Sequence, residues 1–256
     1  MQPLLYFSYG MTKTGSTLAF QMVRSALDLC GFPQDRLDLD VVDPNLRRNF
    51  VNHITDEQLD KLKEEARKRG YPLVLKTHMR PDPGVVKMIQ SGEAIAHAGY
   101  RDPRDMILSM LDHAKKSRAE GLSNFGELET VDQTLENIRG QFNTLTAWLR
   151  LPGTMPLYFE DIAFDTVEPI KRILQRLRLK FDPALLSDIV LNQRFTQKNK
   201  GVRLRYPNEM TKEDSSRIAQ EFEPFITRFI NNRSTLAEDG RVLLPPPQHL
   251  RTSARD

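Results

Sequence analysis

The feature that most constrains the fold is an apolar run that ends in a glycine-bearing turn and leads directly into an amphipathic segment. The run covers residues 4–8, and Gly10 and Gly15 bracket the turn. From Ser16 to about residue 30, apolar side chains recur at helical spacing. A continuous apolar strand is typical of a parallel sheet that is covered on both faces. The start of the chain therefore predicts a strand, a loop and a helix of an α/β fold.

The same alternation of strand and helix continues along the chain. Further strands are expected at residues 72–75, 93–100 and 156–159. Helices are expected at residues 55–69, 84–91, 131–149, 166–178, 182–192 and 211–231, with another beginning at 102. The last strand is expected to end in Glu160-Asp161. This pattern predicts a single α/β domain with a central parallel sheet, helices on both faces, and the P-loop-containing nucleotide-binding type of fold.

Composition restricts the class of protein further. The 256 residues are 39% hydrophobic and 28% charged, and the net charge is +3. No segment approaches the ~18 apolar residues of a membrane span, and no dense basic stripe indicates nucleic acid. Residues 1–232 are expected to form the domain, and 233–256 a polar, proline-rich tail. A single cysteine allows no internal disulfide, so a reducing, cytoplasmic location is expected.

The turn after the first strand has the features of a phosphate-binding loop. Gly10 and Gly15 have the separation of the glycines in the ATP-binding motif, and Thr17 fills its Ser/Thr place. Its lysine place, however, holds Ser16, and the nearby ammonium is Lys13 inside the loop. Backbone N–H groups at a helix start bind oxyanions. We therefore expect an anion site without the usual grip on a nucleoside triphosphate, rather than a plain surface turn.

The ends of two further strands also carry cationic or titratable groups. Lys76 and His78 follow the second strand, and Arg101 follows the third, just before a helix that Asp102 caps. Because ligands bind at the carboxyl ends of parallel strands, we expect these groups to share one cleft with the first loop. Each has a structural alternative: a histidine capping a strand end, a solvated lysine, or an arginine paired with Asp105.

Five short segments, in the same order, are similar to motifs of the cytosolic-type sulfotransferases. The segments are 12–17 (5′-phosphosulfate loop), 75–78 (K-T-H), 100–105 with Ser109 (3′-phosphate motif), 159–161 (Y-E-D) and 198–201 (R-K-G loop). The resemblance implies transfer of a sulfuryl group from 3′-phosphoadenosine-5′-phosphosulfate (PAPS) to a hydroxyl or amine. The product nucleotide would be adenosine 3′,5′-bisphosphate (PAP), and no metal would be needed.

The resemblance also implies a role for each matching residue. His78 would be the general base, with Lys13 and Lys76 at the transferring group. The residues implied in binding the nucleotide are Lys13, Thr14, Gly15, Ser16, Thr17, Leu18, Arg101, Ser109, Phe159, Lys200 and Gly201. The acids Glu160 and Asp161 would be mainly structural, and Arg104 is expected to be exposed.

Three positions depart from the family pattern. Thr12 replaces a proline, Leu18 replaces a tryptophan that helps to stack the adenine, and Phe159 replaces a tyrosine. Adenine stacking would then fall to Phe159 or to Phe195, and the sequence does not choose between them.

Two other functions and the acceptor stay open. An ATP-dependent phosphotransferase is disfavoured by Ser16, and a non-catalytic nucleotide-binding protein by the presence of both Lys13 and His78. Acceptor walls would come from residues 33–54, 79–92 and 113–130, which mix apolar and charged side chains. That mixture favours a small metabolite or lipid-like alcohol or amine. The oligomeric state is left open.

Overall fold

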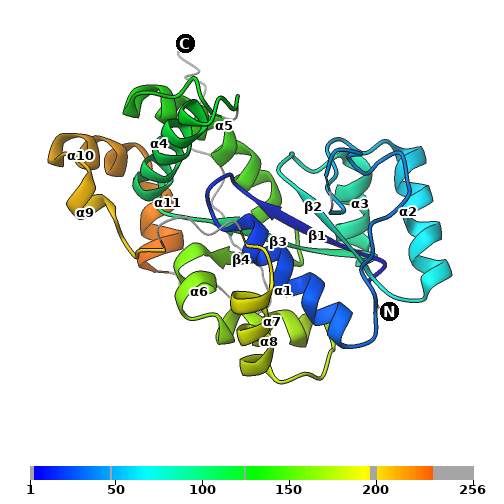
Figure 1. Cartoon of the computed structure of the whole chain (residues 1–256). Helices are drawn as coiled ribbons and strands as arrows, with labels where there is room; N and C mark the ends of the chain where they lie inside the picture. Colours follow the sequence, from blue (N-terminus) through cyan, green and yellow to red (C-terminus); the bar gives the residue numbers. More distant parts are fainter. Residues whose placement is uncertain (1–2, 47, 124, 197–200, 233–256) are drawn as a thin grey trace, which may run out of the picture.

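A computed structural model shows a four-stranded sheet with helices packed around it (Figure 1). It describes residues 3–46, 48–123, 125–196 and 201–232. The strands are β1 (Leu5–Gly10), β2 (Leu73–Thr77), β3 (Ala94–Tyr100) and β4 (Thr154–Tyr158). All pairs are parallel, in the order β2-β1-β3-β4. The predicted α/β fold with a parallel sheet is confirmed, whereas the predicted tail at 233–256 lies outside the described residues.

Helices cover both faces of the sheet because strand side chains alternate between them. The helices are α1 (Ser16–Leu29), α2 (Asp56–Arg69), α3 (Pro83–Ser91), α4 (Pro103–Ala119), α5 (Val131–Leu149), α6 (Phe159–Phe164), α7 (Val167–Leu177), α8 (Pro183–Gln193), α9 (Tyr206–Glu209), α10 (Lys212–Glu221) and α11 (Glu223–Phe225), followed by the π-helix η1 (Ile226–Asn231). Tyr6 and Val74 pack on the side of α1, α7 and α8. Phe7 and Leu75 pack on the opposite side with α2, α3, α4 and α5.

The order of the strands puts a switch point at the carboxyl ends of β1 and β3. These two strands are neighbours, but the chain continues from β1 to β2 on one side and from β3 to β4 on the other. Such a divergence opens a ligand crevice between the loops that follow the strands. Gly10 pairs in register with Gly99 of β3, and this close pairing lets the loop after β1 run beside the end of β3.

Trp148 of α5 connects the core to this end of the sheet. Its indole is fully buried and stacks on Tyr9 of β1, with the ring centroids 5.4 Å apart. Its Nε1–H donates to the carbonyl of Met79 at 2.8 Å, which fixes the backbone directly after His78. A buried indole N–H needs such a partner, and here the bond also holds the segment that follows β2.

Two predicted elements differ in the structure. β4 ends at Tyr158, and Glu160 and Asp161 lie in the first turn of α6 instead of at a strand end. The predicted helix 211–231 is divided into α10, α11 and η1. Pro224 stands at the division, and proline lacks the N–H that would continue the helical hydrogen bonds.

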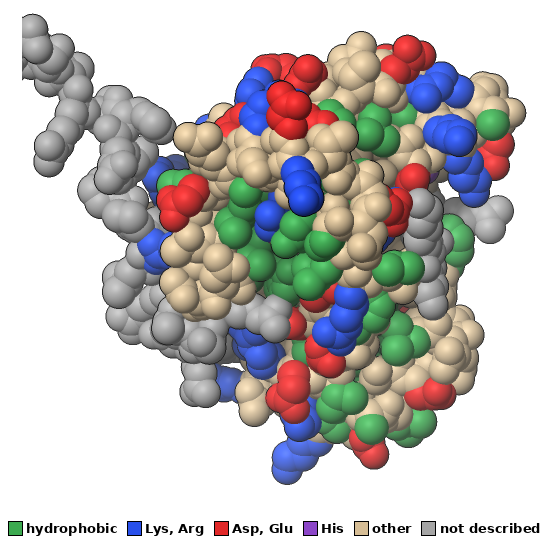
Figure 2. Space-filling view, turned by 90° about the vertical axis from the view of Figure 1, so that its left-hand side faces the viewer, with side chains coloured by type: hydrophobic (Ala, Val, Ile, Leu, Met, Phe, Trp, Pro, Cys, Tyr) green, Lys and Arg blue, Asp and Glu red, His purple; other side chains and the backbone are tan. Residues whose placement is uncertain are grey.

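The face that bears α9 and α10 is mixed in character. Figure 2 shows hydrophobic side chains gathered near its middle, with lysine, arginine and acidic side chains around them. Charges of both signs are interspersed among the side chains that the view shows. Among the described residues, no helix combines the length and the apolar character that a membrane crossing requires.

Candidate active site

The loop between β1 and α1 has the conformation of an anion-binding loop. Lys13 and Gly15 have φ values of 64° and 72°, in the left-handed region. A Cβ atom on Gly10 would lie 2.7 Å from the Cβ of Ser16, so only glycine fits there. The Thr14 hydroxyl donates to the Met11 carbonyl at 2.7 Å and holds the turn closed. The N–H groups at the start of α1 are thereby directed toward a common point, where a phosphate would be stabilised.

Lys76 and His78 extend from the end of β2 toward this loop. The Lys76 ammonium is buried and donates to the hydroxyl of Thr17, in the first turn of α1, at 2.9 Å. Nδ1 of His78 lies 2.6 Å from the carbonyl oxygen of Gly10. A carbonyl only accepts, so Nδ1 carries the hydrogen and Nε2 keeps its lone pair. Lys76 thus contacts the first turn of α1, and His78 contacts the residue at which β1 ends.

Burial changes the protonation of both groups. Burial, followed by the charge of Lys76, lowers the pKa of His78 to about 4. Burial and the neighbouring Arg48 lower the pKa of Lys76 to about 7. At neutral pH the imidazole is therefore neutral and able to accept a proton at Nε2. With a pKa of about 7, Lys76 is protonated in only about half of the molecules at pH 7, and a nearby anion would raise its pKa again.

Arg101 lies on the other side of the loop, at the end of β3. Its side chain is almost fully buried and stacks on the ring of Phe159, 4.0 Å from the centroid. One Nη atom lies 3.4 Å from the carboxylate of Asp105, which is the structural alternative that the sequence left open. Among the residues that the structure describes, Nε–H of Arg101 nevertheless has no hydrogen-bond partner. A buried guanidinium with an unused donor fits a phosphate ligand, and Ser109 lies buried two turns along α4.

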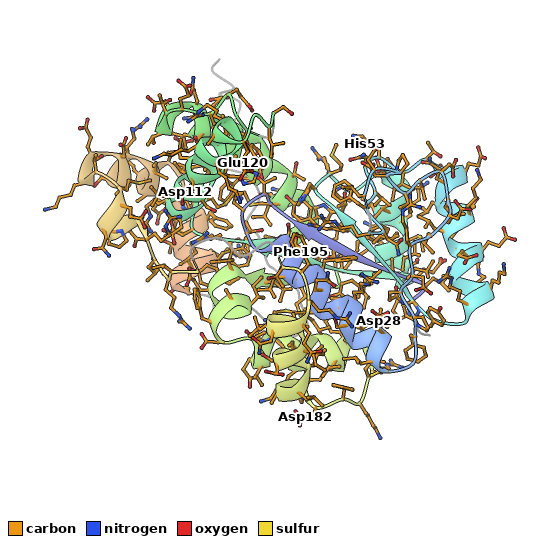
Figure 3. The ribbon with its side chains drawn as sticks, in the orientation of Figure 1. Asp28, His53, Asp112, Glu120, Asp182 and Phe195 are labelled. Carbon is orange, nitrogen blue, oxygen red and sulfur yellow. The ribbon has the colours of Figure 1, made fainter. Side chains whose placement is uncertain are left out.

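Lys13 stands between Arg101 and α4. Burial and the charge of Arg101 lower the pKa of Lys13, while Asp112 of α4 acts in the opposite direction. Burial, Lys13 and Lys116 lower the pKa of His113, which places this histidine near Lys13 as well. Figure 3 shows Asp112 on α4, on the side toward α9. Cations therefore border the loop on both the β2 side and the β3 side.

The other residues that the sequence singled out lie in different surroundings. Leu18, in the first turn of α1, is buried in the core on the side of α7 and α8. Phe159 packs against the loop, where a Cβ on Gly15 would lie 3.0 Å from its ring. Phe195 is 69% exposed and lies over α1 (Figure 3). Gly201 is exposed with a φ of 64°, and Lys200 lies outside the described residues.

The expectation that Arg104 is exposed was wrong. Its guanidinium pairs with Asp102 at 2.6 Å and stacks on Tyr206, 3.6 Å from the ring centroid. The backbone N–H of Tyr206 also donates to Asp105 at 2.9 Å. These contacts attach the start of α9 to the start of α4.

Three residues near the site had no motif to indicate them. The side-chain oxygen of Gln141, on α5, accepts hydrogen bonds from both the N–H and the hydroxyl of Thr12 at 2.8 Å, and so holds the loop against α5. Arg205 is buried and pairs with Asp112 at 2.8 Å. Arg48 donates to the hydroxyl of Thr17 at 3.3 Å. All three act across long separations in sequence, so a local pattern does not reveal them.

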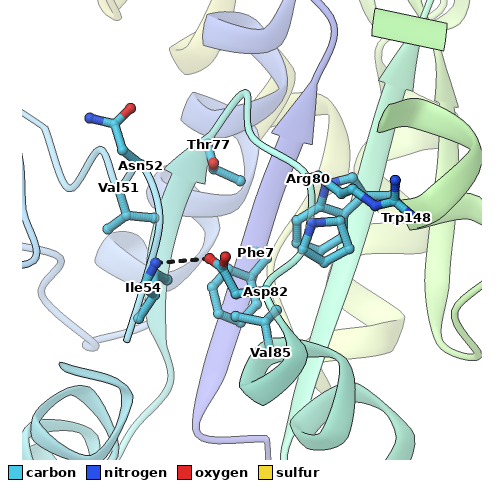
Figure 4. A pocket seen from close by; sticks show the side chains of 10 residues that line it. Phe7, Val51, Asn52, Ile54, Thr77, Arg80, Asp82, Val85 and Trp148 are labelled. Carbon is cyan, nitrogen blue, oxygen red and sulfur yellow. Dashed lines mark hydrogen bonds between the residues drawn. The ribbon is translucent and has the colours of Figure 1, made fainter. Parts of the chain in front are cut away.

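A small pocket lies beside the end of β2, close to the position of His78. It is lined by Phe7, Val51, Asn52, Ile54, Thr77, Arg80, Pro81, Asp82, Val85 and Trp148. In Figure 4 the Asp82 carboxylate accepts from the N–H of Ile54, at 2.8 Å. Six of the ten lining residues are apolar and four are polar or charged, and the empty volume of about 180 Å³ is below the ~300–1,000 Å³ of typical small-molecule pockets.

The donor set of the site suits an anion rather than a metal. Among the described residues, no group of three or more His, Cys, Asp or Glu side chains could hold a metal ion. The groups that converge instead are the loop N–H groups, Lys13, Lys76 and Arg101 with its unused Nε–H. A nucleotide with phosphates at two positions fits this set, because the cations lie on both sides of the loop.

Comparison with known proteins agrees with this geometry. No curated protein sequence matches the chain. Retinol dehydratase in complex with retinol and PAP has a TM-score of 0.54 and 17% identity, over 88% of this chain and 82% of that one. Retinol dehydratase with androsterone and PAP has a TM-score of 0.53 and 16% identity, over 88% and 81%. A mouse sulfotransferase complexed with PAP has a TM-score of 0.55 and 14% identity, over 90% and 87%.

At these identities the likeness to solved structures shows the fold alone. The sequence profile described as "Sulfotransferase domain" matches residues 7–232. That match includes the loop after β1, the ends of β2 and β3, and the start of α6, all of which border the site. The chain therefore belongs to the sulfotransferase domain family and is an enzyme of sulfuryl transfer.

Proposed function

We propose that the protein transfers the sulfuryl group of PAPS to a hydroxyl or amine of a small acceptor in the cytoplasm. This proposal is carried by one observation: Lys76, His78 and Arg101 lie around the loop after β1, at one end of the sheet. A neutral histidine with a free Nε2 beside several cations suits a reaction in which a proton leaves the acceptor and negative charge forms on a phosphate.

The chain binds the nucleotide through groups on both sides of the loop. The N–H groups at residues 14–17 would hold the 5′-phosphate, and Arg101 with Ser109 the 3′-phosphate. Phe159 closes the gap between Gly15 and Arg101 and is the better placed of the two candidate aromatic residues for contact with the nucleotide. Bound PAPS supplies a sulfuryl group on a phosphate that can leave as PAP.

The proposed transfer needs one base and two neutralising cations. Nε2 of His78 would take the proton of the acceptor hydroxyl as the new S–O bond forms and the S–O bond to the phosphate breaks. Lys13 and Lys76 would stabilise the charge that moves to the leaving phosphate oxygen, as positioning and electrostatics dominate in the related phosphoryl transfers. The hydrogen bond from Nδ1 to Gly10 fixes the tautomer that this step requires.

A small lipid-like alcohol is the acceptor class that we favour. The solved relatives are described with retinol and with androsterone, which are both alcohols of this kind. The apolar residues of the pocket beside the end of β2 support the same class here, as does the ring of Phe50, which packs at a tilt against His78 with the ring centroids 5.5 Å apart.

The first test is calorimetric titration with PAP and, separately, with ATP and Mg²⁺. We expect PAP to bind to the wild type and to bind at least tenfold more weakly to Arg101→Ala, because a charge-assisted phosphate contact is lost. Arg67→Ala removes an exposed arginine on α2 and should leave PAP binding unchanged. Binding of ATP with Mg²⁺ but not PAP would replace this proposal with the phosphotransferase alternative.

The base assignment has a separate test. His78→Asn should bind PAP as the wild type does but lose sulfuryl transfer to a lipid-like test alcohol by a factor of about 10² or more. A variant that keeps full transfer would remove His78 from its proposed role.

A further inference from the structure

The segment before α2 is attached to the outer edge of β2 at the level of Lys76. The N–H of Lys76 donates to the carbonyl of Asn49 at 2.7 Å, and the N–H of Val51 donates to the carbonyl of Lys76 at 2.8 Å. The buried amide of Asn49 accepts from the N–H of Leu37 at 2.8 Å and donates to the carbonyl of Asp35 at 3.1 Å. The backbone beside Arg48 is therefore held in place by ordinary sheet and side-chain hydrogen bonds.

This attachment brings a second cation to the hydroxyl that Lys76 contacts. Nη1 of Arg48 lies 3.3 Å from Oγ1 of Thr17, and Nζ of Lys76 lies 2.9 Å from the same oxygen. Within the described part of the chain, neither cation forms an ion pair with a carboxylate. When both groups are protonated, two positive charges this close repel each other, and partly buried charges are normally compensated. The pair is therefore arranged for an anion that the protein itself does not supply.

The position of the pair indicates which part of the nucleotide it meets. Lys13 and Arg101 border the loop on the β3 side, whereas Arg48 and Lys76 border it on the β2 side together with His78. Arg48 also acts electrostatically on His78, the base that faces the acceptor. An anionic group beside His78 is, under the proposed function, the group that is being transferred.

We propose that Arg48, together with Lys76, binds the oxygen atoms of the sulfuryl group, and so lets the enzyme distinguish its donor PAPS from its product PAP. This inference rests on the proposed function. It assigns a binding role to a residue outside every motif of the sequence. Since PAP lacks the sulfuryl group, Arg48 should contribute to the affinity for PAPS much more than to that for PAP.

The test compares both nucleotides on one variant in the absence of acceptor. Calorimetry gives the affinity for PAP, and displacement of PAP by PAPS gives the affinity for the donor. In Arg48→Gln we expect PAPS to bind about tenfold more weakly, the loss of roughly one hydrogen bond between charged groups, while PAP affinity changes less than twofold. Arg48→Lys should recover part of the loss, and Arg67→Ala should behave as the wild type for both ligands.

Each other result overturns the inference in a distinct way. An equal loss for PAPS and PAP would place Arg48 at the 5′-phosphate, and no loss for either would remove it from the nucleotide altogether. Thermal unfolding followed by circular dichroism shows whether the glutamine and lysine variants are folded at the titration temperature. If the wild type bound neither nucleotide, the proposed function would fail, which is a different outcome from a failure of Arg48 alone.

Discussion

The titration of His78 offers the sharpest test of the geometry of the site. Burial is the main cause that lowers its pKa to about 4, and the charge of Lys76 is the next. An ordinary histidine with a pKa near 6.5 would be only about 10% neutral at pH 5.5, whereas His78 should be about 97% neutral at that pH. The base form should therefore persist throughout the mildly acidic range.

The assay is NMR of protein labelled with ¹³C in its histidine rings, recorded from pH 7.5 to pH 4. His78→Asn assigns the signal by removing it from the spectrum. Lys76→Met gives a second readout, because loss of the neighbouring positive charge should raise the pKa of His78 and move its midpoint toward 6.5. Bound PAP should move the midpoint in the same direction, since its phosphates add negative charge.

A midpoint for His78 near 6.5 in the free protein would refute the reasoning. It would mean that the imidazole is exposed to water and that its hydrogen bond to Gly10 does not hold it in the cleft. If the midpoint of His78 were low in the wild type and unchanged in Lys76→Met, His78 would be buried but not close to the charge of Lys76.

Two further predictions concern stability. His97 is fully buried between Tyr6 and Ser8, and burial lowers its pKa to about 3. Below pH 6.5 the unfolded chain takes up a proton at His97 and the native state does not, so the protein becomes less stable as the pH is lowered. Between pH 7.5 and 5.5 the decrease in unfolding free energy should therefore be about 1.4 kcal/mol smaller in His97→Gln than in the wild type. Equal decreases for the two proteins in urea titrations would contradict this. Arg205→Ala removes the buried partner of Asp112 and should lower the unfolding free energy by about 2–4 kcal/mol, somewhat less than the ~3–5 kcal/mol lost when a fully buried pair is broken, because the acids are partly exposed. The exposed Arg217→Ala should cost less than about 1 kcal/mol by the same titration.

The elements that the sequence predicted well are those whose signals are local. The helix 131–149 has the predicted bounds, because its apolar stripe is read from neighbouring residues, and the structure adds the capping box of Thr130 at its start. The end of β4 was predicted less well. Phe159 and its neighbours suit a strand or a helix equally. In the structure they form the start of α6, where Phe159 packs between Gly15 and Arg101.

For the site, the sequence alone identified the loop after β1, the histidine after β2 and the arginine after β3, because each lies directly next to a recognisable strand. Which groups actually touch was decided by tertiary structure. Arg48 reaches Thr17 only because an irregular segment pairs with the edge of β2, and Gln141 reaches Thr12 from a helix 129 residues later. Such contacts depend on the summed geometry of distant elements, so the residues that make them carry no pattern of their own in the sequence.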